Sequence, residues 1–342
     1  MSIDEFTLLG QLLAETPTQA EALLCGVGDD CAVVSGGAHR DWLISTDHCV
    51  EGIHFRRSWA EWSVLGGKAA LAALSDIAAM GGRPRFVLVG LGIPDSMCAA
   101  EVRECFRGVR VAATDAGALV IGGDTTRAEL GCHLAITVIG EVPHGRALYR
   151  RGARPGDSLY VTGWLGGSAA GLQLLMARDQ SEGATSADPL SRDRLMQRHL
   201  HPPLRTAAGQ WLASTGCVSA MIDISDGLLA DVGQIATASG VRVQIEAVRV
   251  PLCEGVTAVA EARGEDPLAF GAASGEEYEL AFTVFGSRAA AFRQLVAGAE
   301  RTLGHPLTYL GEVQEGAGVA LSDPNGRSMP IASSGFAHQF QE

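Results

Sequence analysis

Lysine and long runs of basic residues are almost absent from this chain. Its 342 residues include 26 lysines and arginines, of which Lys68 is the only lysine, against 39 acidic residues and a net charge of −13. No basic stretch is longer than pairs such as Arg56-Arg57 and Arg150-Arg151. Proteins that bind nucleic acid usually carry a basic stripe, so nucleic acid is not an expected partner. The acidic excess remains compatible with anionic substrates when metal ions stand between carboxylates and phosphates.

The chain also lacks a long apolar run and any Cys-x-x-Cys pair. No stretch approaches about 18 uncharged apolar residues, so neither a membrane span nor a membrane partner is expected. Residues 1–5 are acidic where a secretory signal would be basic. The eight cysteines are scattered, which indicates free thiols in a reducing compartment. These absences predict a cytoplasmic protein.

Common catalytic motifs are missing as well. Lys68 is not part of a phosphate-binding P-loop, and neither His-Glu-x-x-His nor Gly-x-Ser-x-Gly occurs. Residues 39–41 imitate the catalytic loop of protein kinases, but the asparagine that this loop needs is absent, since the only asparagine is Asn325. His199 and His201, beside two prolines, are typical of a turn rather than a metal site. Standard protein-kinase, P-loop, zinc-protease and hydrolase interpretations therefore lose support.

The pattern of apolar residues indicates a mixed α/β (α+β) fold. At about 100–200 residues per domain, the length favours two domains. Short β-branched runs that end in Gly or Asp predict strands, and apolar residues at helical spacing predict helices. The predicted strands are 42–45, 86–92, 118–121, 133–140, 158–162, 220–224 and 280–285, and the predicted helices are 63–80, 99–116 and 225–239.

A polar, Gly- and Pro-rich segment near the middle of the chain, residues 143–157, predicts a domain boundary. We therefore expect domains at 1–143 and 144–342, the second completing a site that begins in the first. Another polar stretch, residues 178–194, is interpreted as an exposed loop between helices.

Acidic residues stand at the ends of apolar strands and in Gly-rich turns. Taken singly they have ordinary explanations, because Ser225 or Asp226 could cap a helix and Asp29 could belong to a turn. Asp76 is different, since a carboxylate inside an apolar helix needs a partner or a metal. The segments that carry these acids are Gly28-Asp29-Asp30, Ser45-Thr46-Asp47, Gly122-Gly123-Asp124 and Asp223-Ile224-Ser225-Asp226.

These carboxylates predict a Mg²⁺ site. Mg²⁺ prefers oxygen ligands and is typically held by a few carboxylates together with substrate phosphates. The glycines beside Asp124 would let backbone N–H groups approach a phosphate, and a helix that begins near Asp226 would add a positive N-terminus. The residues therefore indicate a phosphoryl-transfer or ATP-dependent enzyme that relies on metal ions rather than on a lysine loop.

In seven segments the sequence resembles the thiamine-monophosphate kinase family of the aminoimidazole-ribonucleotide-synthetase superfamily. The segments occur in order over nearly the whole chain, which makes their combination specific. They are GVGDDCAVV (26–34), STDHCVEGIHF (45–55), KAALAALSDIAAMGGRP (68–84), IGGDTTRA (121–128), RRGARPGD (150–157), DISDGLLADVG (223–233) and SGEEYELAFTV (274–284).

The resemblance implies two α/β domains, a homodimer paired through the N-terminal domains, and Mg²⁺-dependent transfer of phosphate from ATP to thiamine monophosphate, giving thiamine diphosphate. No general base is identified, and none is needed, since a phosphate with a second pKa of about 6 is already anionic at neutral pH. By motif position, the implied metal ligands are Asp30, Ser45, Thr46, Asp47, Asp76, Asp124, Asp223 and Asp226. The implied ATP contacts are Gly123, Asp124, Arg150 and Ser225, and the implied substrate contacts are His54, Glu276 and Phe336.

One departure and two alternatives accompany this resemblance. Phe106 stands where the family pattern has a tyrosine near the nucleotide, so a hydroxyl contact is lost there. One alternative is another ATP-dependent enzyme of the superfamily, such as a selenophosphate synthetase, for which Cys25 is the only candidate reactive cysteine. The other is a non-catalytic protein that binds a nucleotide or a thiamine phosphate.

Overall fold

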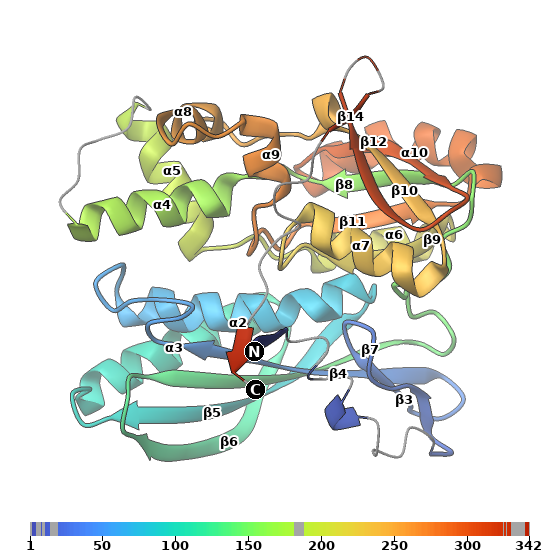
Figure 1. The fold of residues 1–342 in the computed structure, drawn as a ribbon. Helices are drawn as coiled ribbons and strands as arrows, with labels where there is room; N and C mark the ends of the chain where they lie inside the picture. The colour runs from blue at the N-terminus through green and yellow to red at the C-terminus, as the bar shows by residue number, and fades with distance from the viewer. Residues whose placement is uncertain are drawn as a thin grey trace.

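Two mixed sheets, each covered by helices, form the two halves of the molecule (Figure 1). The computed structural model describes residues 2–4, 8, 11–13, 20–180, 188–323, 325, 327–329 and 339–341. Strand β15 (Gln339–Gln341) returns to the N-terminal half, where it pairs antiparallel with β1 (Ser2–Asp4). The described residues thus confirm the predicted mixed α/β fold.

The N-terminal sheet has six strands in the order β2-β3-β4-β7-β5-β6. Along β7, buried and partly buried residues alternate, as expected for a strand with one face on a core, and Leu134, Ile136 and Val138 point into it. All pairings are antiparallel except that of β5 with β6. The strands are β2 (Leu23–Cys25), β3 (Ala32–Ser35), β4 (Arg40–Val50), β5 (Arg83–Pro94), β6 (Leu119–Ala128) and β7 (His133–Pro143).

Helix α2 (Trp62–Ala79) runs between the two halves and is buried on most of its surface (Figure 1). Glycine permits this packing against α3 (Ala99–Asp115), because a Cβ at Gly66 would lie 2.1 Å from the Cys105 carbonyl oxygen. On its other side, a Cβ at Gly209 would lie 2.1 Å from the Ala78 carbonyl oxygen. A helix with apolar residues all round is expected in such an interior position. Polar side chains of α2 are therefore held between the domains.

The C-terminal sheet has seven strands in the order β14-β13-β10-β12-β8-β11-β9. Among the described strands of this sheet, only β10 and β13 pair in parallel. Helix α2 packs on α6 and on β9, so the carboxyl end of β9 meets the first domain. The elements of this half are β8 (Ser158–Thr162), α4 (Gly167–Gln180), α5 (Pro189–Leu200), α6 (Thr206–Thr215), β9 (Val218–Asp223), α7 (Leu228–Ser239), β10 (Arg242–Glu246), η1 (Ala247–Arg249), α8 (Val256–Ala262), α9 (Pro267–Ala272), β11 (Leu280–Val284), η2 (Gly286–Arg288), α10 (Ala289–Leu303), β12 (Leu307–Gln314), β13 (Gly318–Ser322) and β14 (Ser328–Met329).

The predicted loop at 178–194 is partly wrong, because helices occupy both of its ends. Helix α4 continues to Gln180, and α5 begins at Pro189. The Asp188 carboxylate caps α5 by accepting hydrogen bonds from the backbone N–H groups of Leu190 and Ser191, and proline suits the first position of a helix. Within the described residues, no helix has the length and apolar character that crossing a membrane requires.

Candidate active site

A cavity of about 590 Å³ lies between the two domains, with walls from both. The first domain contributes the end of β4, the segment after it and one side of α2. The second contributes the start of α4 and the segments that follow β9 and precede β11. Seven of the predicted site residues line this cavity: Asp47, His54, Asp76, Asp223, Ser225, Asp226 and Glu276.

Three predicted metal ligands meet beside this cavity in what we call the acidic cluster: Asp30, Asp76 and Asp223. Each offers a carboxylate oxygen, and these oxygens all lie within 4.8 Å of one another. Asp30 comes from the turn before β3, Asp76 from α2, and Asp223 from the end of β9. Because these elements are distant in sequence, only the packing of the second domain on α2 assembles the cluster.

The acidic cluster has too little positive charge around it to neutralise its carboxylates. Burial raises the pKa of Asp30 to about 8, although Arg150 opposes the shift. Burial, and then the charges of Asp47 and Asp223, raise the pKa of Asp76 well above its ordinary value. The pKa of Asp47 rises to about 6, again through burial first and Asp223 second. Mutual repulsion of this kind favours a bound cation.

Neighbouring side chains orient the cluster and leave one oxygen unsatisfied. Ser45 Oγ donates to Asp76 Oδ2 at 2.5 Å, and Ser75 Oγ donates to Asp223 Oδ2 at 2.6 Å. Arg150 donates to Asp30 Oδ1 at 2.6 Å, whereas Asp30 Oδ2 is buried and has no hydrogen-bond partner among the described residues. A buried orphan oxygen among hard oxygen donors fits a divalent cation such as Mg²⁺.

The segment before α7 is held by a carboxylate that sequence reasoning did not identify. Asp231 Oδ2 accepts hydrogen bonds from the backbone N–H groups of Ser225, Asp226 and Gly227 at 3.0–3.1 Å. The N-cap residue is Gly227, so neither Ser225 nor Asp226 caps the helix. These three N–H groups precede the first turn of α7, so Asp231 fixes the segment before the helix. That the helix N-terminus adds a positive end beside a phosphate stays a prediction. Ser225 and Asp226 line the cavity.

Three other predicted metal or nucleotide contacts lie apart from the cluster in this chain: Thr46, Gly123 and Asp124. Side chains alternate along a strand, so Thr46 lies on the opposite face of β4 from Ser45 and Asp47. Its Oγ1 lies 3.1 Å from Thr137 Oγ1. Asp124, with Gly123, is exposed on β6, and β7 and β5 separate it from β4. At the usual strand spacing this places Asp124 about 14 Å from Asp47.

The other end of the cavity carries the two predicted substrate contacts within the described residues. His54 Nδ1 accepts a hydrogen bond from the Val50 backbone N–H at 3.0 Å. Glu276 Oε2 lies 3.1 Å from Lys68 Nζ. Lys68 also approaches His199 Nε2 at 2.9 Å, and neither residue was predicted as part of the site. The third predicted contact, Phe336, lies outside the described residues.

A signal for Lys68 does exist in the sequence, since it is the only lysine and lies in an apolar helix that has no other cation. Sequence reasoning tested it only as a P-loop residue. His199 carried no such signal, because its partner lies 131 positions away.

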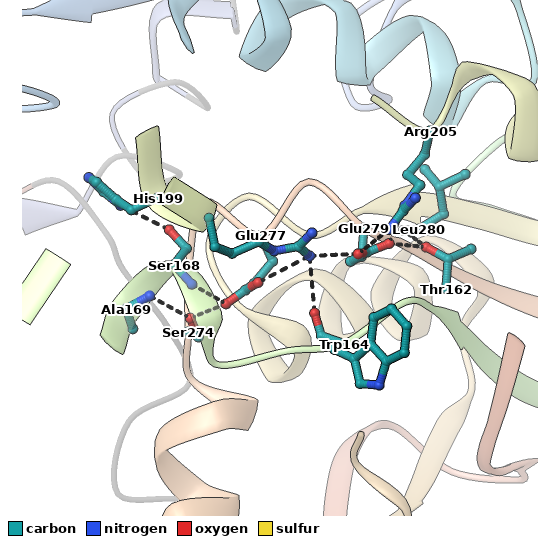
Figure 2. Close-up of polar contacts among 11 residues, drawn as sticks. Thr162, Trp164, Ser168, Ala169, His199, Arg205, Ser274, Glu277, Glu279 and Leu280 are labelled. Carbon is teal, nitrogen blue, oxygen red and sulfur yellow. Dashed lines mark hydrogen bonds and ion pairs between the residues drawn. The ribbon is translucent and has the colours of Figure 1, made fainter. Parts of the chain in front are cut away.

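A second group of buried acids, Glu277 and Glu279, lies next to Glu276 in the chain (Figure 2). Together with Arg198 and Arg205 they form what we call the glutamate–arginine network. Arg205 makes two hydrogen bonds to Glu279, and Arg198 donates to Glu279 Oε1 at 2.6 Å. Thr162 Oγ1 donates to Glu279 Oε2 at 2.6 Å. Burial would raise the pKa of Glu279, but the hydrogen bond and charge of Arg205 hold it below its ordinary value. Glu279 is thus neutralised by the protein itself. Glu277 faces Arg198 at 3.5 Å, but burial raises its pKa above the ordinary value.

Family models place this architecture in a known class. The model of the AIR synthase related protein, N-terminal domain, matches residues 28–142, and that of the C-terminal domain matches residues 154–323. The chain therefore has both domains of the AIR synthase related proteins. Structures of the hydrogenase maturation protein HypE from E. coli share this fold, with a TM-score of 0.69 at 22% identity.

Comparison with individual proteins is more specific. Thiamine-monophosphate kinase of Escherichia coli K12 is 36% identical over 317 residues, covering 92% of this chain and 91% of the relative. That of Bacillus subtilis 168 is 32% identical over 313 residues, covering 92% of each chain. A solved structure described as AaThiL complexed with AMPPCP and TMP has a TM-score of 0.81 at 30% identity, covering 98% of this chain and 97% of that one. This chain belongs to the thiamine-monophosphate kinase family.

Proposed function

We propose that this protein transfers the γ-phosphoryl group of ATP to thiamine monophosphate, giving thiamine diphosphate and ADP. Besides family membership, one structural observation supports the proposal. A single interdomain cavity brings Asp76 and Asp223 of the acidic cluster together with His54 and Glu276, the residues expected to hold the acceptor. A charged donor and a charged acceptor could therefore be bound side by side in one cavity.

The acidic cluster is the proposed Mg²⁺ site. Asp30, Asp76 and Asp223 would hold the cation, with Asp47 at the cavity wall. Bound Mg²⁺ would neutralise charge between the two anionic substrates. The predicted ligands Ser45 and Asp226 belong to the same proposal, Ser45 through its hydrogen bond to Asp76. Thr46 and Asp124 lie apart from the acidic cluster in this chain, so their role as metal ligands stays a prediction outside this site.

The reaction is proposed to be a direct in-line transfer without a protein base. The acceptor oxygen belongs to a phosphate whose second pKa is about 6, so it is largely ionised at neutral pH. Catalysis then depends on positioning and electrostatics. His54 and Glu276, with Phe336, are proposed to hold the acceptor. Gly123, Asp124, Arg150 and Ser225 are proposed to contact ATP.

We further propose a cytoplasmic homodimer paired through the N-terminal domains, with domains at 1–143 and 144–342. The edge strand β6 supports this pairing because Leu119 and Ile121 are 64% and 54% exposed on it. An exposed apolar edge strand favours association with another copy. Gly123 and Asp124 lie on the same strand, so pairing along β6 would place them at the interface between two copies.

The test is formation of thiamine diphosphate from ATP and thiamine monophosphate, with and without Mg²⁺, and with free thiamine as the control acceptor. We expect product only when both the monophosphate and Mg²⁺ are present. Absence of product from protein that still binds ATP would contradict the proposed kinase and favour another reaction of the superfamily or a binding role.

A further inference from the structure

Lys68 connects the two domains at the acceptor end of the cavity. It lies on α2 with its side chain 2% exposed, yet it is part of the cavity wall. Its ammonium group has three acceptors: Glu276 Oε2 at 3.1 Å, His199 Nε2 at 2.9 Å and the His54 carbonyl oxygen at 3.3 Å. An ammonium group has three hydrogens to donate, so all of its donors are used by the protein.

The charge of Lys68 is unusual in its surroundings. Among the described residues that line the cavity there is no arginine, and Lys68 is the only lysine. Removal of that charge would leave Glu276 in an acidic cavity with no fixed counterion. An unpaired buried carboxylate changes its position or its protonation state. The orientation of Glu276 thus depends on Lys68.

The bond from Lys68 also fixes the tautomer of His199. A lysine ammonium only donates, so His199 Nε2 accepts and Nδ1 carries the proton, which it donates to Ser168 Oγ at 3.0 Å. Burial, and then the charge of Lys68, lower the pKa of His199 to about 4, which keeps the ring neutral at neutral pH. His199 therefore serves as a fixed acceptor that holds the ammonium group in place.

The backbone presents Glu276 to Lys68 in a strained conformation. Glu276 and Tyr278 have φ of 54° and 50°, values that residues other than glycine adopt rarely. Glu276 and Tyr278 line the cavity, whereas Glu277 and Glu279 point away into the glutamate–arginine network (Figure 2). Strain of this kind persists where surrounding contacts hold it, and it is common at ligand sites.

We propose that Lys68 is a positioning residue for the acceptor substrate. It holds the Glu276 carboxylate in the orientation that substrate binding requires, and it does not bind the substrate itself. The inference rests on the proposed function, because Glu276 is the acceptor contact assigned there. All three donors of Lys68 are used within the protein, so its action passes through Glu276 rather than through a direct bond to phosphate.

A double-mutant comparison tests this route. Lys68→Met, Glu276→Gln and the combined variant are assayed for kcat and for the KM of each substrate, with Arg103→Met on the exposed face of α3 as the control. We expect Lys68→Met and Glu276→Gln each to raise the KM for thiamine monophosphate about tenfold to a hundredfold, with less than about twofold change in the KM for ATP. The combined variant should match Glu276→Gln within about threefold, since both changes break one interaction.

Two results would overturn the inference. An unchanged acceptor KM in folded Lys68→Met would make the lysine purely structural, and multiplied effects in the combined variant would indicate a direct contact with substrate. If Lys68→Met does not fold, Glu276→Gln compared with the combined variant still tests the route, because neither retains an unpaired carboxylate at 276. Wild-type protein that forms no thiamine diphosphate would instead contradict the proposed function, a separate result.

Discussion

Two groups of buried acids lie near the same cavity but differ in how their charge is balanced. Glu277 and Glu279 are surrounded by Arg198 and Arg205 in the glutamate–arginine network. Among the described residues, the acidic cluster has a single arginine, Arg150, for three carboxylates. Each group has one buried carboxylate oxygen without a hydrogen-bond partner there, Asp30 Oδ2 and Glu277 Oε2. Burial is common to both, so burial alone does not identify a functional acid. The shortage of positive charge around the acidic cluster is what distinguishes its carboxylates as functional.

The largest expected effect comes from neutralising one member of the acidic cluster. Asp76→Asn keeps the shape of the side chain but removes a charge needed to hold a cation, so we expect activity to fall about a thousandfold or more. Stability in EDTA should be unchanged or higher, because repulsion among buried carboxylates is relieved. Formation of thiamine diphosphate and urea unfolding measure the two effects.

The matched control for this change is Asp115→Asn at the exposed end of α3, which should leave both quantities unchanged. Asp76→Asn protein with more than about a tenth of the wild-type activity would remove the functional distinction between the two groups of acids.

The opposite behaviour is expected in the glutamate–arginine network. Arg205→Met leaves Glu279 with part of its charge unpaired in the interior, which should lower the free energy of unfolding by about 3–5 kcal/mol. Urea unfolding measures this loss, and Arg301→Met on the exposed side of α10 is the control. A loss below about 1 kcal/mol would show that the network does not depend on internal pairing.

Magnesium should stabilise only the group that lacks counter-charge. At a Mg²⁺ concentration 100 times its Kd, we expect the free energy of unfolding to rise by about 2.7 kcal/mol in the wild type. The gain should disappear in Asp76→Asn and persist, from a lower starting value, in Arg205→Met. Equal stabilisation of wild type and Asp76→Asn would place the bound cation elsewhere.

The last expected effect is a dependence of stability on pH. The folded pKa values of Asp30 and Asp47 are raised to about 8 and about 6, so the folded chain binds more protons than the unfolded chain above pH 4. In EDTA, stability should therefore decrease as pH rises from 5 to 8, by at most about 1.4 kcal/mol per pH unit for each extra proton. Saturating Mg²⁺ should flatten this slope. A free energy of unfolding that rises from pH 5 to 8 in EDTA, measured by urea unfolding, would contradict the raised pKa values.

Local patterns in the sequence predicted much of this structure. Apolar runs gave the central strands, and helical spacing gave α2 and α3 within one residue of their observed ends. Asp76 was identifiable because a carboxylate in an apolar helix requires a partner. The other two acids of the cluster, Asp30 and Asp223, stand in a turn and at the end of a strand, which are positions that a single sequence displays.

Features that depend on the order of strands and the packing of domains could not be predicted. Asp124 follows the same sequence logic as Asp47, yet β7 and β5 separate their strands. Asp231 caps from inside the helix, whereas sequence rules look for a cap before it. Lys68 and His199 meet only because α5 packs across α2. Contacts of this kind, between residues far apart in the sequence, leave no local sequence pattern.

The most direct test of this account is the location of a bound divalent cation. Crystals soaked in Mn²⁺, a scatterer that takes the same oxygen ligands as Mg²⁺, would show it by anomalous diffraction. We expect density among Asp30, Asp76 and Asp223 and none at Glu277 or Glu279. Density at the glutamates, or none at the aspartates under conditions that support activity, would contradict it.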